Sequence, residues 1–119
     1  MPGSASPQLV VACLCAAWCS SCRAYRPTFD QVATQFASAR FVWIDFEDDA
    51  TLVDGLEVED FPTLLIAAED GPRFFGPLTP QPEVLARLVR AHRAGEGGAV
   101  RVEPALTAVV DRIRARLMA

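Results

Sequence analysis

All four cysteines of this 119-residue chain fall within one ten-residue stretch, at Cys13, Cys15, Cys19 and Cys22. A disulfide framework that staples a small secreted protein places its cysteines far apart along the chain. Cysteines gathered in one short segment instead indicate redox chemistry or metal binding.

Cys19 and Cys22 form a Cys-x-x-Cys pair that follows an apolar segment and opens a helical pattern. At a helix N-terminus, unpaired backbone N–H groups and the helix dipole stabilise a thiolate, here at Cys19. Cys22 follows one helical turn later, on the same face, within bonding reach and deeper in the protein. We therefore expect Cys19 to attack a substrate disulfide and Cys22 to resolve the mixed disulfide.

The elements that must position this pair can be predicted from the apolar pattern. Residues 8–15 are apolar from Leu9 onward, which predicts a buried strand. Apolar residues then recur every three or four positions, which predicts a helix over residues 19–39, kinked at Pro27. Further strands are expected at 41–46, 63–68 and 73–75, helices at 80–93 and 104–118, and a short strand at 100–102. This order predicts an α/β fold with a mixed sheet and helices on both faces.

The run Trp-Cys-Ser-Ser-Cys-Arg at residues 18–23 resembles the active-site segment of the thioredoxin family. Pro27 matches the proline that kinks the family's active-site helix. The segment Phe61-Pro62-Thr63 looks like its cis-proline segment, and Gly76 matches the glycine after its hairpin. The resemblance covers about residues 8–93 and implies a thioredoxin-like fold.

The same resemblance implies a function, a protein-disulfide oxidoreductase with Cys19 and Cys22 as its catalytic residues. Electrons would come from a reductase, and no cofactor or metal is called for. A cis peptide bond would precede Pro62, and the Phe61 backbone would pair with an extended substrate peptide. The implied substrate contacts are Trp18, Phe61, Pro62, Thr63 and Gly76.

Three departures from the family pattern stand out. Ser20-Ser21 replaces the usual Gly-Pro between the cysteines, and Cys13 and Trp43 replace a buried Asp and a Lys, so the proton relay of the resolving cysteine is missing. The family's first strand and helix have no room in residues 1–7, which we expect to be a flexible arm. The extension at 94–119 would cover the exposed sheet, in the same chain or swapped into a second copy as a homodimer.

Two other interpretations remain open. Four thiolates could bind zinc, but we expect Cys13 and Cys15 to lie on a strand face away from the other two and to act as small buried hydrophobes. A redox role for Cys13 beneath Cys22 is the lesser alternative. The chain could also be a thioredoxin-fold adaptor or chaperone-like module in which exchange activity is weak or vestigial.

Composition restricts the partners. A net charge of −4 argues against nucleic acid, which needs a basic face. The longest apolar run is about half of the roughly 20 residues that span a bilayer, which argues against a membrane. Residues 1–8 carry no Lys or Arg, so the positive region of a signal peptide is absent, and we expect a cytoplasmic protein.

Overall fold

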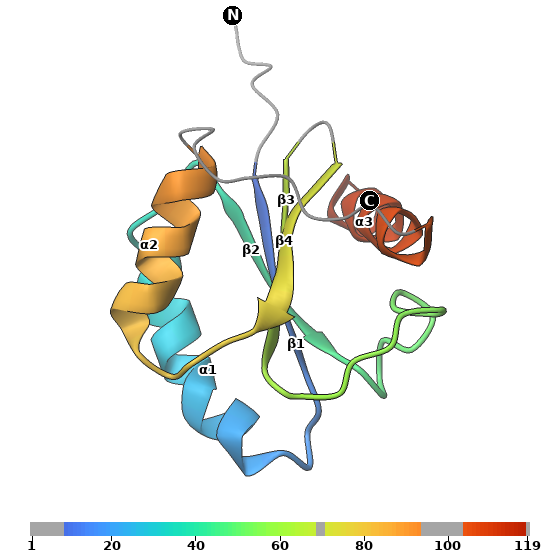
Figure 1. The fold of residues 1–119 in the computed structure, drawn as a ribbon, viewed down its shortest axis with the longest axis horizontal. Helices are drawn as coiled ribbons and strands as arrows, with labels where there is room; N and C mark the ends of the chain where they lie inside the picture. Colours follow the sequence, from blue (N-terminus) through green and yellow to red (C-terminus); the bar gives the residue numbers. More distant parts are fainter. Residues whose placement is uncertain (1–8, 69–70, 94–103, 119) are drawn as a thin grey trace, which may run out of the picture.

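The structure, a computed structural model, describes residues 9–68, 71–93 and 104–118. Its strands are β1 (Val10–Cys15), β2 (Arg40–Asp45), β3 (Thr63–Ala68) and β4 (Gly71–Pro77), and its helices are α1 (Ser20–Ala33), α2 (Pro82–Arg93) and α3 (Pro104–Met118). The strands form one sheet in the order β2-β1-β3-β4, with β1 parallel to β2 and the other two pairs antiparallel (Figure 1). This arrangement confirms the predicted mixed sheet.

Helix α1 ends at Ala33, six residues before the expected end. The Thr34 hydroxyl donates a hydrogen bond to the Gln31 carbonyl at 2.7 Å, and the next backbone N–H groups bond three residues back. These tighter turns end the α-helical pattern, although Phe36 beyond them is still buried in the core.

Strand β1 is covered on both faces, which explains its unbroken apolar sequence. Because side chains alternate along a strand, Val11, Cys13 and Cys15 pack toward α1 and α2. The intervening residues Val10 and Leu14 pack toward α3 on the opposite face. The side of the sheet that holds the cysteines is therefore the side on which α1 lies.

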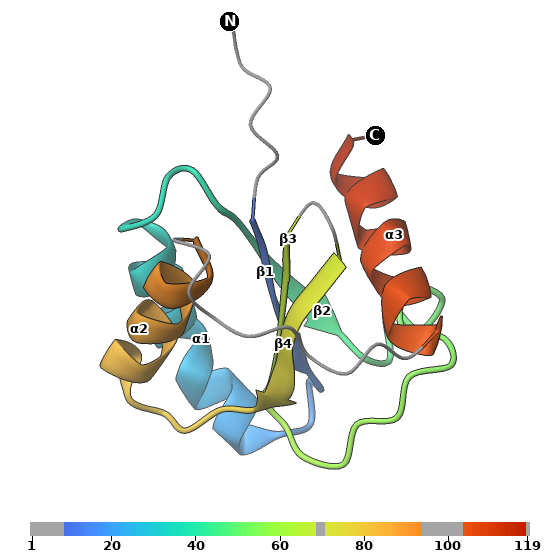
Figure 2. The same ribbon diagram turned by 45° about the horizontal axis from the view of Figure 1, so that its top comes forward.

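Helix α3 covers the second face of the sheet, opposite α1 and α2 (Figure 2). Four of its apolar side chains are buried there: Leu106, Val109, Val110 and Ile113. Helix α3 therefore packs on the sheet of its own chain. The expected strand at 100–102 and the arm at 1–7 lie outside the described residues.

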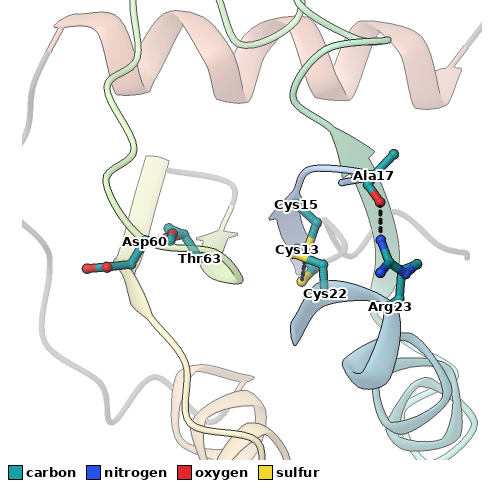
Figure 3. Close-up of a disulfide and its surroundings, with 7 residues drawn as sticks. All are labelled: Cys13, Cys15, Ala17, Cys22, Arg23, Asp60 and Thr63. Atoms are coloured by element: carbon teal, nitrogen blue, oxygen red, sulfur yellow. Dashed lines mark hydrogen bonds between the residues drawn. A yellow bond between two sulfur atoms is a disulfide. The ribbon is translucent and has the colours of Figure 1, made fainter. Parts of the chain in front are cut away.

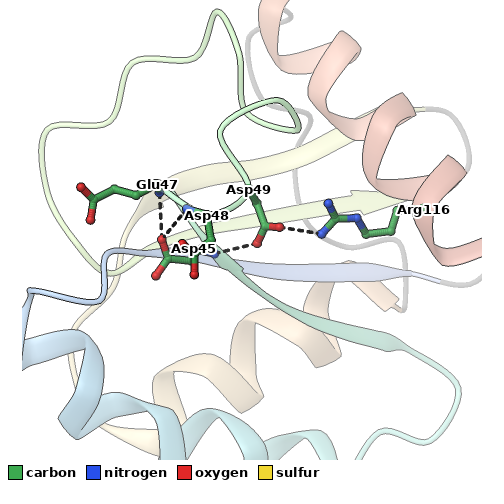
Figure 4. A network of polar contacts seen from close by, with 5 residues as sticks. All are labelled: Asp45, Glu47, Asp48, Asp49 and Arg116. Carbon is green, nitrogen blue, oxygen red and sulfur yellow. Dashed lines mark hydrogen bonds and ion pairs between the residues drawn. The ribbon is translucent and has the colours of Figure 1, made fainter.

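The loop after β2 is tied to α3 by polar contacts (Figure 4). Asp45 accepts hydrogen bonds from the backbone N–H groups of Glu47 and Asp48, at 2.8 and 2.9 Å. Asp49 accepts one from the Asp45 N–H at 3.2 Å and pairs with the Arg116 guanidinium at 2.8 Å. The Asp45 and Asp49 carboxylates therefore stabilise this loop and its contact with α3. None of the helices that the structure describes is long and apolar enough to cross a membrane.

Candidate functional site

Cys19 occupies the position immediately before the first residue of α1. Its backbone is extended, with φ −86° and ψ 116°, and its carbonyl accepts the N–H of Arg23 at 3.2 Å. The Arg23 side chain also donates to the Ala17 carbonyl at 2.7 Å, which fixes the turn between β1 and α1 (Figure 3). No side chain caps this helix end, so its N–H groups remain available to stabilise a negative charge at Cys19.

Cys22, in contrast, is buried and is joined by a disulfide to Cys15, the last residue of β1 (Figure 3). Their Cα atoms lie 5.8 Å apart, and Cys19 is a free, partly exposed thiol. Our expectation that Cys15 faces away from the other cysteines and serves only as a buried hydrophobe is therefore wrong. The missed signal is strand alternation, because Cys15 shares its face with Val11, toward the helix that follows β1.

Cys13 lies beneath this disulfide. Its Sγ is 3.7 Å from the Sγ of Cys15, and because a disulfide sulfur carries no hydrogen, Cys13 must be the donor. Burial raises the pKa of Cys13 to about 12, although the positive charge of Arg26 opposes this shift. Cys13 is thus a neutral thiol near pH 7. Among the described residues, no group of three or more His, Cys, Asp or Glu is arranged to hold a metal ion.

This pKa predicts how Cys13 affects stability at alkaline pH. Between an ordinary value of 9.0 and the raised value of about 12, Cys13 ionises in the unfolded chain but not in the folded protein. Its contribution to stability is therefore intact below pH 9 and is lost as pH rises, by up to ~1.4 kcal/mol per pH unit. In a Cys19→Ser background, which removes exchange by the free thiol, we expect the free-energy advantage of the parent over Cys13→Ala to fall by ~2 kcal/mol between pH 8 and 10.5. Urea unfolding at both pH values measures this, and parallel pH profiles would contradict it.

Trp43, which stands where the resemblance places a Lys, and the nearby Tyr25 lie in apolar surroundings. Trp43 packs edge-on against Phe29, with ring centroids 5.6 Å apart, and the guanidinium of Arg26 lies 4.8 Å from its ring centre. Tyr25 is buried, and its hydroxyl has no hydrogen-bond partner among the described residues. Burial, and then the negative charge that Cys13 would carry, raise the pKa of Tyr25, so its phenol stays neutral. Tyr25 belongs to the apolar repeat of residues 19–39, and that pattern gives no sign of its buried hydroxyl.

Two of the expected substrate contacts come together at the loop before β3. The Phe61-Pro62 peptide bond is cis, as the resemblance implies. The Trp18 ring stands edge-on to Phe61, with centroids 5.8 Å apart, and Trp18 is 65% exposed. Trp18 is the one large apolar side chain, among the described residues, that is exposed. This pair forms an apolar surface next to the start of α1.

The other expected contacts, Pro62, Thr63 and Gly76, divide between two hollows. Phe61 and Pro62 line a hollow of about 330 Å³ that α1 closes with Ser21, Ala24 and Tyr25. Thr63 and Gly76 instead line a separate hollow of about 270 Å³, together with the acidic residues Glu57, Glu59 and Asp60. Thr63 is buried, and its hydroxyl donates to the Asp60 carbonyl, so its side chain stabilises the loop before β3. The five predicted residues consequently divide between two surfaces.

Comparisons with known proteins agree with this geometry. A family model described as Thioredoxin matches residues 4–77. The chain belongs to the thioredoxin family. This thioredoxin-family chain is 36% identical over 62 residues to "Thioredoxin-like protein 1" of Schizosaccharomyces pombe, covering 50% of this chain and 21% of that protein. It is 30% identical over 81 residues to "Thioredoxin Asp f 29" of Aspergillus fumigatus, covering 66% and 73% of the two chains.

The thioredoxin-like fold is shared with solved structures. The crystal structure of thioredoxin from Trypanosoma brucei brucei matches with a TM-score of 0.65 and 22% identity, over 75% of this chain and 78% of that one. The sequence match to the fission-yeast relative, in contrast, spans only about a fifth of the length of that protein. Family membership and a disulfide-forming cysteine pair together support thiol–disulfide oxidoreductase chemistry at the level of the family.

Proposed function

We propose that this chain reduces protein disulfides, with Cys19 as the nucleophile and Cys22 as the resolving thiol. The observation that carries the proposal is the placement of a free, partly exposed Cys19 at the N-terminus of α1. Cys22 lies one turn further along the helix, and the exposed ring of Trp18 immediately precedes Cys19. A protein substrate can reach Cys19, whereas the buried Cys22 can react only with a sulfur that already lies at the site, such as that of Cys19.

The reaction consists of two exchange steps. The Cys19 thiolate attacks one sulfur of the substrate disulfide, so that a mixed disulfide forms and the other substrate sulfur leaves as a thiolate. The Cys22 thiolate then attacks the Cys19 Sγ, which forms an intramolecular disulfide and releases the second substrate thiol. Two electrons pass from the chain to the substrate, and a reductase in the cytoplasm would return them.

Substrate positioning would use the apolar surface of Trp18 and Phe61. The Pro62 carbonyl already accepts the Leu78 N–H at 3.2 Å, which holds the loop against the segment after β4. We propose that the Phe61 backbone in this loop pairs with an extended segment of the substrate. Acidic residues Glu59 and Asp60 beside it would favour basic or neutral partners.

The proposal is tested by insulin-disulfide reduction with dithiothreitol as the electron source. We expect Cys19→Ser to lower the rate at least ~100-fold, because removing the nucleophile of a covalent mechanism removes most of its catalysis. Cys13→Ala is the matched control, since it deletes a buried thiol without a proposed part in exchange, and its rate should stay near that of the wild type. A wild type no faster than Cys19→Ser would reject the proposal.

One observation favours the adaptor as the second candidate. In this structure Cys22 is bonded to Cys15, so Cys19 is left without a resolving partner. A chain locked in that form would capture a partner through Cys19 but not release it. Failure of the insulin assay, with Cys19 still labelled by partner disulfides, would support this function.

A further inference from the structure

We propose that Cys15 is a third redox-active cysteine, which exchanges with Cys19 for the bond to Cys22. The inference rests on the proposed function and adds a step to it. It starts from the disulfide itself, which joins Cys15 to Cys22 and leaves the nucleophile free.

Two sulfurs are placed to bond with that of Cys22. Cys15 lies at the end of β1, on the face that α1 covers, with a Cα–Cα distance of 5.8 Å. Cys19 precedes the first residue of the helix that contains Cys22, and side chains three residues apart on a helix have Cβ atoms about 5–6 Å apart. The Cα separation of Cys15 and Cys22 falls in the range that a disulfide bridges, about 4.4–6.8 Å. Cys19 and Cys22 have the Cys-x-x-Cys spacing of disulfide oxidoreductases, in which the two sulfurs also bond. Either bond can therefore form in this fold.

The step conserves electrons. After substrate release, the chain carries a Cys19–Cys22 disulfide and a Cys15 thiol. Loss of a proton from Cys15 to water gives a thiolate, which attacks the Cys22 Sγ. The Cys22–Cys15 bond forms, the Cys22–Cys19 bond breaks, and Cys19 leaves as a thiolate. No external oxidant or reductant takes part, because one disulfide replaces another.

Burial and charge favour this direction. Cys15 and Cys22 are each 1% exposed, whereas Cys19 is partly exposed. The exchange moves the disulfide from the surface into the core and places the departing negative charge at the N-terminus of α1.

The consequence is a change in what Cys19 can do. With Cys22 held by Cys15, a second attack by Cys19 on a substrate disulfide gives a mixed disulfide that Cys22 cannot resolve. The oxidised chain thus retains its partner until the Cys15–Cys22 bond is reduced. Cys15 in this way determines whether the chain releases its reduced substrate or retains it as a mixed disulfide with Cys19.

Disulfide mapping tests the third cysteine directly. Cys19→Ser is oxidised with diamide, denatured, alkylated and mapped by peptide mass spectrometry. We expect a Cys15–Cys22 disulfide, which persists when Cys13→Ala is added and is lost when Cys15→Ala is added instead. Cys13 and Cys15 are buried cysteines on the same strand face, so the two double variants are matched. A Cys19→Ser protein that keeps three alkylatable thiols would overturn the proposal.

The wild type provides the second readout. We expect its oxidised form to contain Cys15–Cys22 with alkylated Cys19, and a tenfold excess of this form would make its reduction potential ~30 mV lower than that of Cys15→Ala. Cys13→Ala should leave the Cys15–Cys22 bond in place. A map with Cys19–Cys22 alone, or equal potentials for wild type and Cys15→Ala, would overturn the role of Cys15. Insulin reduction is unaffected by that outcome, so the two proposals fail separately.

Discussion

Cys22→Ser is expected to turn the chain into a covalent trap. Cys19 can still attack a substrate disulfide, but no sulfur one helical turn away is left to attack the mixed disulfide. Intramolecular attack owes its speed to a high effective concentration, so we expect the mixed disulfide to persist at least ~100-fold longer than in the wild type. Incubation with a fluorescent peptide disulfide, acid quenching and non-reducing electrophoresis measure the adduct over time.

The double variant Cys19→Ser/Cys22→Ser is the matched control for this trap, and it should form no adduct. An adduct of Cys22→Ser that decays as fast as that of the wild type would show that another thiol resolves it. Cys15 is the candidate for that thiol, because it is the sulfur bonded to Cys22 in the structure. Adding Cys15→Ala to Cys22→Ser distinguishes the two cases.

Val109→Asp is expected to unfold much of the protein. Val109 is fully buried among apolar side chains where α3 packs against the sheet. An unpaired buried carboxylate costs at least ~3 kcal/mol, a large share of the 5–15 kcal/mol that stabilises a typical domain. The free energy of unfolding in urea, measured with the cysteines reduced, reports the loss.

Ala115→Asp places the same carboxylate on an exposed position of the same helix and should change stability by less than ~0.5 kcal/mol. If Val109→Asp were as stable as the wild type, α3 would not belong to the core in solution. A shared loss in both variants would instead point to a general effect of charge on the helix.

The order of helices and strands could be predicted because it follows from local patterns. The unbroken apolar run from residue 9 to residue 15 indicated a strand covered on both faces, and both faces are indeed covered. The end of α1 was set by a side-chain contact, that of Thr34 with Gln31, which the apolar period does not encode. The cis bond before Pro62 came from the resemblance alone.

The site was harder to predict than the fold. Cys-x-x-Cys spacing specifies a turn of helix, so it led to Cys19 and Cys22 and to nothing outside that helix. The partner of Cys22 depends on how a strand end and a helix pack together, which no spacing within one element describes. The same applies to Thr63 and Gly76, which the fold places in a different hollow from Phe61.

The docking of α3 has a consequence for biosynthesis. The sheet face formed by Val10 and Leu14 is translated about a hundred residues before Ile113, which completes its cover. At roughly 5–20 residues per second, ribosomes would leave this apolar face open for about 5–20 s. Nascent chains would be vulnerable to aggregation throughout that interval, which is when a chaperone would need to hold them.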